Sequence, residues 1–209
     1  MGVRSLSRHL RLHSATLTPD YDDRAYDSHI PLQRYWQRTR FRHIVEMADG
    51  GGRVLDVGCG SSRILGGLPP GSIGLDILLG KLSHARKFGR SLAQGDAACL
   101  PFHDGVFPCV VCSEVVEHIH RDAPVLDELA RVLAPGGRLV IGTPDYGRWE
   151  WRMMERLYRV AAPGGYADQH ITHYTRATLT SLLAQRGLAV EEVRYVGRGE
   201  LIMALRKSR

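Results

Sequence analysis

The sequence has no long apolar run, since no stretch approaches the roughly 18 uninterrupted apolar residues that a membrane-spanning helix needs. The first 18 residues are basic but lack a continuous apolar centre, which argues against a secretion signal. This segment is interpreted either as a frayed tail or as a short amphipathic anchor that would allow peripheral membrane contact. Cysteine is also scarce, with four in 209 residues. The expected location is therefore the reducing cytoplasm.

Lysine is nearly absent, so arginine supplies almost all of the positive charge behind the formal net charge of +6. Such a chain attracts polyanions, but net charge alone does not identify a nucleic-acid partner. Arg34, Arg38 and Arg42 fall at four-residue intervals in an expected helix at 31–48 and would share one face. That face is either solvated or a contact surface for an anionic partner.

Apolar segments of strand and helix type alternate along most of the chain. Strands are expected at 53–57, 72–76, 91–95, 107–112, 138–143, 188–195 and 200–206, and helices at 31–48, 62–67, 80–88, 121–133, 149–160 and 175–186. Strand–helix alternation implies a parallel sheet with helices on both faces. Gly197 and Gly199 shorten the last connection to a hairpin. The expected fold is therefore α/β, with a Rossmann-like, doubly wound, seven-stranded sheet that is mostly parallel and has an antiparallel last strand.

A glycine turn follows the first of these strands. The strand breaks into Gly58 and Gly60, whose spacing predicts a tight turn with its backbone close to a ligand. Asp76 ends the next strand, where an acidic residue suits the two hydroxyls of a ribose. Arg63 stands where the dinucleotide fingerprint needs Gly or Ala, and no Gly-Lys-Ser/Thr follows the turn. A nucleoside-bearing cofactor other than NAD is therefore expected.

From these residues onward the chain resembles the class I S-adenosylmethionine-dependent methyltransferases, in the group called methyltransferase type 11. The segments that carry the resemblance, in the family's order, are Asp56-x-Gly58-x-Gly60, 74–77, 95–97 with 100–102, 110–118 and 129–137. Ser62 departs from the family's third loop glycine. The resemblance implies S-adenosylmethionine as the cofactor. The binding residues it implies are Asp56, Gly58, Cys59, Gly60, Asp76, Ile77, Asp96, Ala97 and Ser113.

The resemblance also implies a role for several of these side chains. Asp56 is expected to favour the cationic part of the cofactor, and Asp76 to accept hydrogen bonds from the ribose. Ile77 would pack on the adenine, and Asp96 would accept from its amino group. Each aspartate is alternatively a turn-forming residue.

The domain organisation is expected to be simple. A flexible basic extension at 1–27 precedes a methyltransferase domain at 28–209. Within that domain, residues 144–175 are rich in aromatic and charged side chains. Such an insertion would cover the carboxyl ends of the strands, where ligands bind in open α/β sheets. We interpret it as a substrate cover.

Three histidines are the candidate catalytic bases, because imidazole titrates near neutral pH. His118 follows the fourth strand, and His170 and His173 lie in the substrate cover. Each has a structural alternative, as a helix cap or as scaffold of the cover. The pattern D-x-H-x-x-H from Asp168 precedes a helix rather than lying along one, and Cys109 and Cys112 would point to opposite faces of a strand. No metal site is therefore expected.

The acceptor is inferred mainly from motifs that the chain lacks. The Asn/Asp/Ser-Pro-Pro-aromatic motif of base amino methylation is missing after the fourth strand, and Pro108-Cys109 lies at the strand's start rather than its end. Glu114 and Glu117 are too close together for the glutamate pair of arginine methylation. We expect methyl transfer to an oxygen of a small-molecule acceptor, with no nucleic-acid partner. Two alternatives stay open: an RNA-directed methyltransferase that uses the arginine face, and a non-catalytic, cofactor-binding regulatory module.

Overall fold

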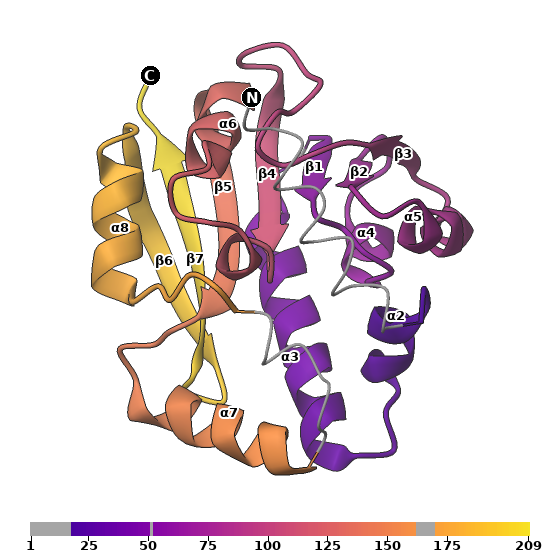
Figure 1. Ribbon diagram of the computed structural model, residues 1–209. Coiled ribbons are helices and arrows are strands. Elements are labelled where there is room, and N and C mark those ends of the chain that lie inside the picture. Colours follow the sequence, from indigo (N-terminus) through magenta and orange to yellow (C-terminus); the bar gives the residue numbers. More distant parts are fainter. Residues whose placement is uncertain (1–17, 51, 162–169) are drawn as a thin grey trace.

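The computed structural model describes residues 18–50, 52–161 and 170–209, without the side chains of 157–161. Within these residues the chain forms a seven-stranded sheet of order β3-β2-β1-β4-β5-β7-β6 (Figure 1). The strands are β1 (Val54–Val57), β2 (Ile73–Asp76), β3 (Ser91–Gln94), β4 (Phe107–Ser113), β5 (Leu133–Pro144), β6 (Leu188–Val196) and β7 (Glu200–Lys207). β7 runs antiparallel to both β5 and β6. The expected doubly wound sheet with an antiparallel last strand is confirmed.

Helices cover both faces of the sheet (Figure 1). They are α2 (Tyr21–Tyr26), α3 (Pro31–Ala48), α4 (Ile64–Gly67), α5 (Leu79–Ala85), α6 (Val125–Val132), α7 (Trp149–Ala161) and α8 (Arg176–Ala184), with 3-10 turns η1 (Arg86–Phe88) and η2 (Val116–His118). Apolar side chains of α6 and α8 pack on one face of the sheet, and those of α3, α4 and α5 pack on the other. Cys112 belongs to the first core and Cys109 to the second, as the period of two along a strand predicts.

Most element boundaries agree with the sequence analysis, and α3 has the expected span. Two differ by several residues. The helix expected from 121 begins at Val125, because Pro124 disfavours helical geometry in the residue before it. The strand expected at 138–143 extends from Leu133 to Pro144, since its first residues already pair with the start of β4.

A helix lies within the segment 1–27, which was expected to be a flexible extension. Residues 21–26 form helix α2, and the predicted flexible segment at 1–27 is wrong for that part. Asp23 fastens this helix to the rest of the domain. Its carboxylate accepts a hydrogen bond from Arg63 Nε at 2.6 Å and lies 3.1 Å from His84 Nε2. Residues 1–17, which carry the prediction of a frayed tail or membrane anchor, lie outside the described residues. Among the described residues, no helix combines the length and apolarity needed to cross a membrane.

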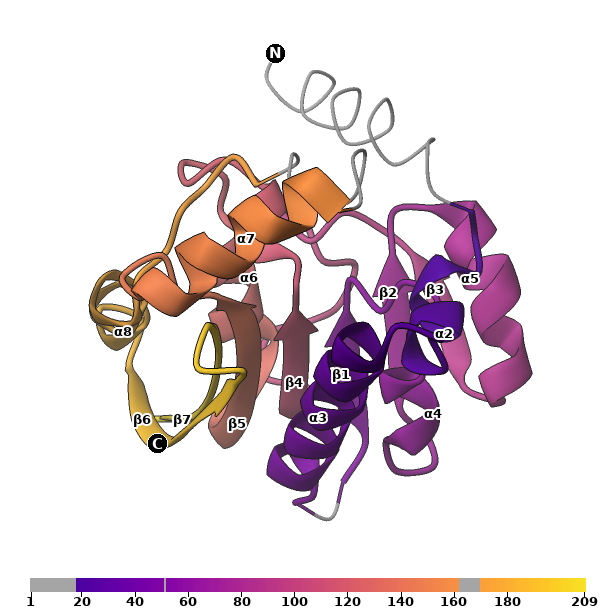
Figure 2. The same cartoon turned by 90° about the horizontal axis from the view of Figure 1, so that it is seen from below.

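The carboxyl ends of the parallel strands meet at one edge of the sheet. Figure 2 looks onto this edge and shows α7 lying across it, in front of β4 and β5. Trp151 of α7 packs on the core that contains Trp36 of α3, and its backbone lies against Gly199 in the β6–β7 hairpin. The start of the expected substrate cover therefore lies over this edge.

Candidate functional site

The glycine loop between β1 and α4 has the geometry of a close-approach turn. Gly58 and Gly60 have φ angles of 70° and 56°, which favour glycine. A Cβ on Gly58 would clash with the side chain of Val115, and one on Gly60 would lie 2.8 Å from Asp22 Oδ2. The amides of Gly58 and Cys59 both donate to the carbonyl of Leu75, at 2.7 and 3.0 Å. The loop is thus fastened to the end of β2.

Asp76, at the end of β2, bridges the glycine loop and the start of α5. Its Oδ2 accepts from the amide of Gly60 at 2.9 Å, and its Oδ1 accepts from the amide of Leu78 at 2.8 Å. Burial raises the pKa of this carboxyl, while these amides oppose the rise. A carboxylate oxygen has two lone pairs, so Asp76 can hold the loop and still accept from a ligand hydroxyl.

Asp56, at the centre of β1, is a buried carboxylate whose charge is not balanced. Only 2% of its surface is exposed, and its Oδ2 has no hydrogen-bond partner in the described part of the chain. Burial, and then the nearby charge of Asp76, raise its pKa to about 7. A cationic ligand group nearby would relieve this cost. The orphaned oxygen and the close-approach glycines therefore fit a cofactor that carries both ribose and positive charge.

The other expected cofactor residues lie along the same edge. Ile77 follows β2 and is half-buried, and Ala97 is buried in the turn after β3. Asp96 accepts from the amide of Ala98 at 2.8 Å, so it also forms a turn. The Oγ of Ser113, at the end of β4, is buried with no partner among the described residues.

Helix α2 adds a residue that the sequence analysis missed. Asp22 Oδ2 accepts from the amide and hydroxyl of Ser61, at 3.2 and 3.0 Å, and pairs with Lys81 Nζ at 2.9 Å. These contacts place Asp22 directly against Gly60. The signal was the acidic Asp22-Asp23 pair, which suits the first turn of a helix.

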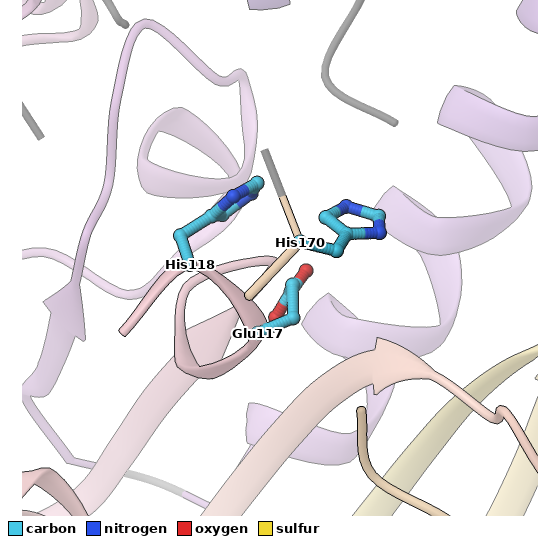
Figure 3. Close-up of side chains that lie close together, drawn as sticks. All are labelled: Glu117, His118 and His170. Carbon is cyan, nitrogen blue, oxygen red and sulfur yellow. The ribbon is translucent and has the colours of Figure 1, made fainter. Parts of the chain in front are cut away.

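A second cluster of polar side chains lies after β4. Glu114 has φ +57°, a rare conformation for a residue with a Cβ, and leads into η2. Glu117, His118 and His170 each place one ligand-type atom within 4.8 Å of the others. Figure 3 shows the Glu117 carboxylate directed toward His170, with His118 facing the same space. The ring centroids of the two histidines are 5.0 Å apart.

Glu117 is the buried member of this cluster. None of its surface is exposed. Its Oε2 accepts from the hydroxyl of Thr143 at 3.0 Å, while its Oε1 has no partner in the residues described. Burial raises the pKa of Glu117 to about 7. From the sequence, Glu117 was part of the segment 110–118 that carries the family resemblance, but it was not named as a candidate catalytic or metal-binding residue.

A chain of hydrogen bonds orients His170. The Tyr146 hydroxyl donates to Glu155 Oε1 at 2.7 Å and lies 2.8 Å from His170 Nδ1. Because that hydroxyl has a single proton, Nδ1–H is the donor to it, and Nε2 carries the lone pair of the ring. His173 is exposed and stacks on Tyr146, with 3.9 Å between ring centroids. Of the three predicted histidines, His118 and His170 thus come together, and His173 lies beside them.

A buried ion network lies next to the cluster. Arg40 of α3 binds both carboxylate oxygens of Glu200, at 2.6 and 2.7 Å, and reaches Glu114 at 3.1 Å. The indole of Trp36 also donates to Glu200. Although burial opposes it, Glu114 and Glu200 raise the pKa of Arg40. Arg38, one of the arginines at four-residue spacing, is not part of this network. It donates instead to Asp27, in the loop before α3.

Comparison with known proteins agrees with this geometry. A family model described as a methyltransferase domain matches residues 26–193. Demethylmenaquinone methyltransferase from Renibacterium salmoninarum is 32% identical over 154 residues, covering 66% of this chain and 64% of the relative. A probable S-adenosylmethionine-dependent methyltransferase from Mycolicibacterium smegmatis is 28% identical over 199 residues, covering 85% of this chain and 72% of the relative. The chain spans from about a third to about two thirds of the length of the first curated relatives.

Solved structures share the fold. The putative methyltransferase in a complex with the Trm112 methyltransferase activator of Haloferax volcanii gives a TM-score of 0.69 at 20% identity, covering 90% of this chain and 94% of the other. A putative methyltransferase from Bacillus halodurans gives a TM-score of 0.66 at 20% identity, covering 82% of this chain and 100% of the other. Together with the family model, they establish that the chain belongs to the class I S-adenosylmethionine-dependent methyltransferases.

Proposed function

We propose that this chain transfers the methyl group of S-adenosylmethionine to an oxygen atom of a small, hydroxylated acceptor. The cofactor supplies a methyl group already activated on a sulfonium. The protein therefore has to align the acceptor and remove its proton. Asp76 would hold the ribose, and Asp56 would face the cationic part of the cofactor.

The observation that carries this proposal is the position of the His118–His170 pair. Val115 packs against Gly58 and lies two residues before Glu117, so the cluster begins next to the glycine loop. His118 is half-buried and therefore within reach of a ligand, whereas the side chain of His170 is only 4% exposed and lies deeper. An acceptor that reaches them would also be close to a cofactor on the loop.

The surroundings of the pair favour a planar acceptor. Tyr146 stacks on His173, and the ring of Trp151 lies nearly parallel to that of His170, at an interplanar angle of 30°. Aromatic faces of this kind pack well against a flat ring. The demethylmenaquinone methyltransferases among the relatives are named for a small-molecule acceptor, which supports the same class here.

The residues suggest how the proton moves. Glu155 and Tyr146 fix His170 so that Nε2 can accept a proton. Once the acceptor hydroxyl has lost its proton to Nε2, its oxygen forms the bond to the methyl carbon. The electrons of the broken carbon–sulfur bond return to sulfur. General-base catalysis of this kind contributes about 10²–10⁴-fold.

The test is a turnover assay with two acceptor panels, one of hydroxylated aromatic compounds and one of RNA. RNA belongs in it because a tRNA (carboxymethyluridine(34)-5-O)-methyltransferase from Arabidopsis thaliana is 29% identical over 142 residues, although the match covers only 35% of that protein. We expect demethylated cofactor to form with the small acceptors only. His170→Ala should lower kcat about 100-fold or more, with cofactor binding kept.

His120→Ala is the matched control, because His120 is exposed and lies two residues after His118. It should keep full activity. Turnover with RNA alone would contradict the proposed acceptor. Cofactor binding without turnover on either panel would instead support a regulatory module.

A further inference from the structure

The Glu117, His118 and His170 cluster has a composition that goes beyond acid–base chemistry. It brings one carboxylate and two imidazoles together from η2 and from a segment more than 50 residues later. Each offers one ligand atom, and these atoms all lie within 4.8 Å of one another. No metal was expected from the sequence, where neither the pattern from Asp168 onward nor the Cys109–Cys112 pair favoured one; Asp168 lies outside the described residues. We propose that these three side chains form a binding site for a divalent transition-metal ion of the zinc or cobalt type.

Glu117 is the strongest single indication. Its side chain is fully buried, yet its Oε1 has no hydrogen-bond partner among the residues described. A buried carboxylate oxygen without a partner costs free energy that a bound cation would recover. In Figure 3 this carboxylate is directed into the space between the two imidazoles.

The donor set also selects the kind of ion. Two imidazole nitrogens and one carboxylate oxygen suit zinc and other first-row transition ions, whereas magnesium and calcium prefer all-oxygen sites. Ligand atoms around a tetrahedral zinc ion, with bonds of about 2.0–2.2 Å, lie about 3.4 Å apart. The widest separation in the cluster, 4.8 Å, must therefore shorten by about 1.4 Å. His118 is half-buried, so rotation of its side chain can supply this movement.

Hydrogen bonds around the cluster match those that support metal ligands. Thr143 donates to Glu117 Oε2, which leaves Oε1 for an ion. Tyr146 receives the Nδ1–H of His170 and donates to Glu155, which leaves the lone pair of the ring on Nε2. Outer partners of this type orient metal ligands and fix their tautomer. Both arrangements are present without any ion in place.

Three protein ligands leave a coordination position open, as in catalytic rather than structural sites. An acceptor hydroxyl bound there would have a lowered pKa and would release its proton to water. With the ion bound, Nε2 of His170 would act as a metal ligand, and the ion would replace this histidine as the group that activates the acceptor. Its oxygen would then form the bond to the methyl carbon, while the electrons of the carbon–sulfur bond pass to sulfur. This catalytic half of the inference rests on the proposed function, whereas the metal-binding half does not.

The experiment titrates Co²⁺ and Zn²⁺ into the full chain after chelator treatment, without methyl donor or acceptor. We expect one ion per chain, the visible absorption of low-symmetry Co²⁺, and no displacement by an equal concentration of Mg²⁺. Glu117→Gln and His170→Ala should each weaken binding at least tenfold. Thr143→Val should weaken it about 10- to 100-fold, because it removes only the outer partner.

His120→Ala is again the control and should bind the ion as the wild type does. Circular dichroism identifies any variant that fails to fold, and Thr143→Val, which nearly preserves side-chain shape, then carries the test. Absence of stoichiometric binding to the wild type, or wild-type affinity in folded Glu117→Gln, would overturn the site. Stoichiometric binding to a chain that transfers no methyl group would leave the metal site standing and refute the proposed function alone.

Discussion

Replacing Asp56 with asparagine removes a charge that the fold buries without a compensating cation. The folded pKa of about 7 compares with 3.8 for an ordinary aspartate. Between these values the folded protein holds a proton that the unfolded chain has lost. The free energy of unfolding therefore falls as the pH rises from about 4 to about 7, and it stays at the lower value above that.

The size of the effect follows from the pKa. A rise of about three units corresponds to an upper bound of about 4 kcal/mol for the ionised form. The new amide of Asp56→Asn also lacks a partner and costs about 1–3 kcal/mol. We therefore expect the variant to be more stable at pH 8 by about 1–3 kcal/mol, or roughly 2–12 °C in Tm. At pH 5 the wild type has lost only about 1.2 of these three units, or about 1.6 kcal/mol, because the unfolded chain is ionised there and the folded protein is not. The cost of the amide offsets this amount, so the gain should vanish.

Thermal unfolding at pH 5 and pH 8 measures this difference. The titratable groups that face Asp56 are Asp76 and the thiols of Cys59 and Cys112. Burial raises the pKa values of both thiols, so the thiols stay neutral at pH 5 and at pH 8. Asp49→Asn, at an exposed position after α3, should show no such dependence. An Asp56→Asn variant that is equally stabilised at both pH values, or destabilised at pH 8, would refute the reasoning.

Two further substitutions separate the cofactor site from the ion network. Asp76→Ala should weaken cofactor binding at least about tenfold, since charge-assisted hydrogen bonds are worth about 1.5–3 kcal/mol; an unchanged dissociation constant in calorimetry would remove Asp76 from the site. Glu200→Gln should lower the free energy of unfolding in urea by about 3–5 kcal/mol, because it leaves the buried Arg40 poorly compensated. The partly exposed ion-pair residue Glu191 is the control, and Glu191→Gln should cost less than about 1 kcal/mol. Equal losses in the two glutamate variants would argue against a structural role for the network.

The cofactor half of the site could be predicted from the sequence because its signals are local. Gly58 and Gly60 follow an apolar strand directly, and Asp76 ends the next one, so a parallel sheet brings them to one edge. Helix α2 could not be predicted in this way. A helix of six residues is not stable by itself, and its contacts to Arg63 and Lys81 come from distant parts of the chain.

The proposed acceptor half of the site depended on tertiary structure. His118 and His170 stood out individually by residue type, but their approach depends on how the chain returns to β4, where the amide of Ile171 bonds to the carbonyl of Glu117 at 2.9 Å. Arg40 is offset by two residues from Arg38 and Arg42 and falls on the face of the buried Trp36 and Ile44, a signal that the sequence analysis did not use. Only the fold shows that it enters the interior and meets Glu200.

The most direct test of the account is calorimetric titration of the purified chain with S-adenosylmethionine, its demethylated product and NAD. The glycine loop with Arg63 at the position where a dinucleotide fold needs a small residue, and the orphaned carboxylate of Asp56, favour the sulfonium cofactor. We predict a single site with micromolar affinity for the methyl donor and for its product, and no measurable binding of NAD. NAD binding as tight as that of the methyl donor, or no binding of either, would contradict the account.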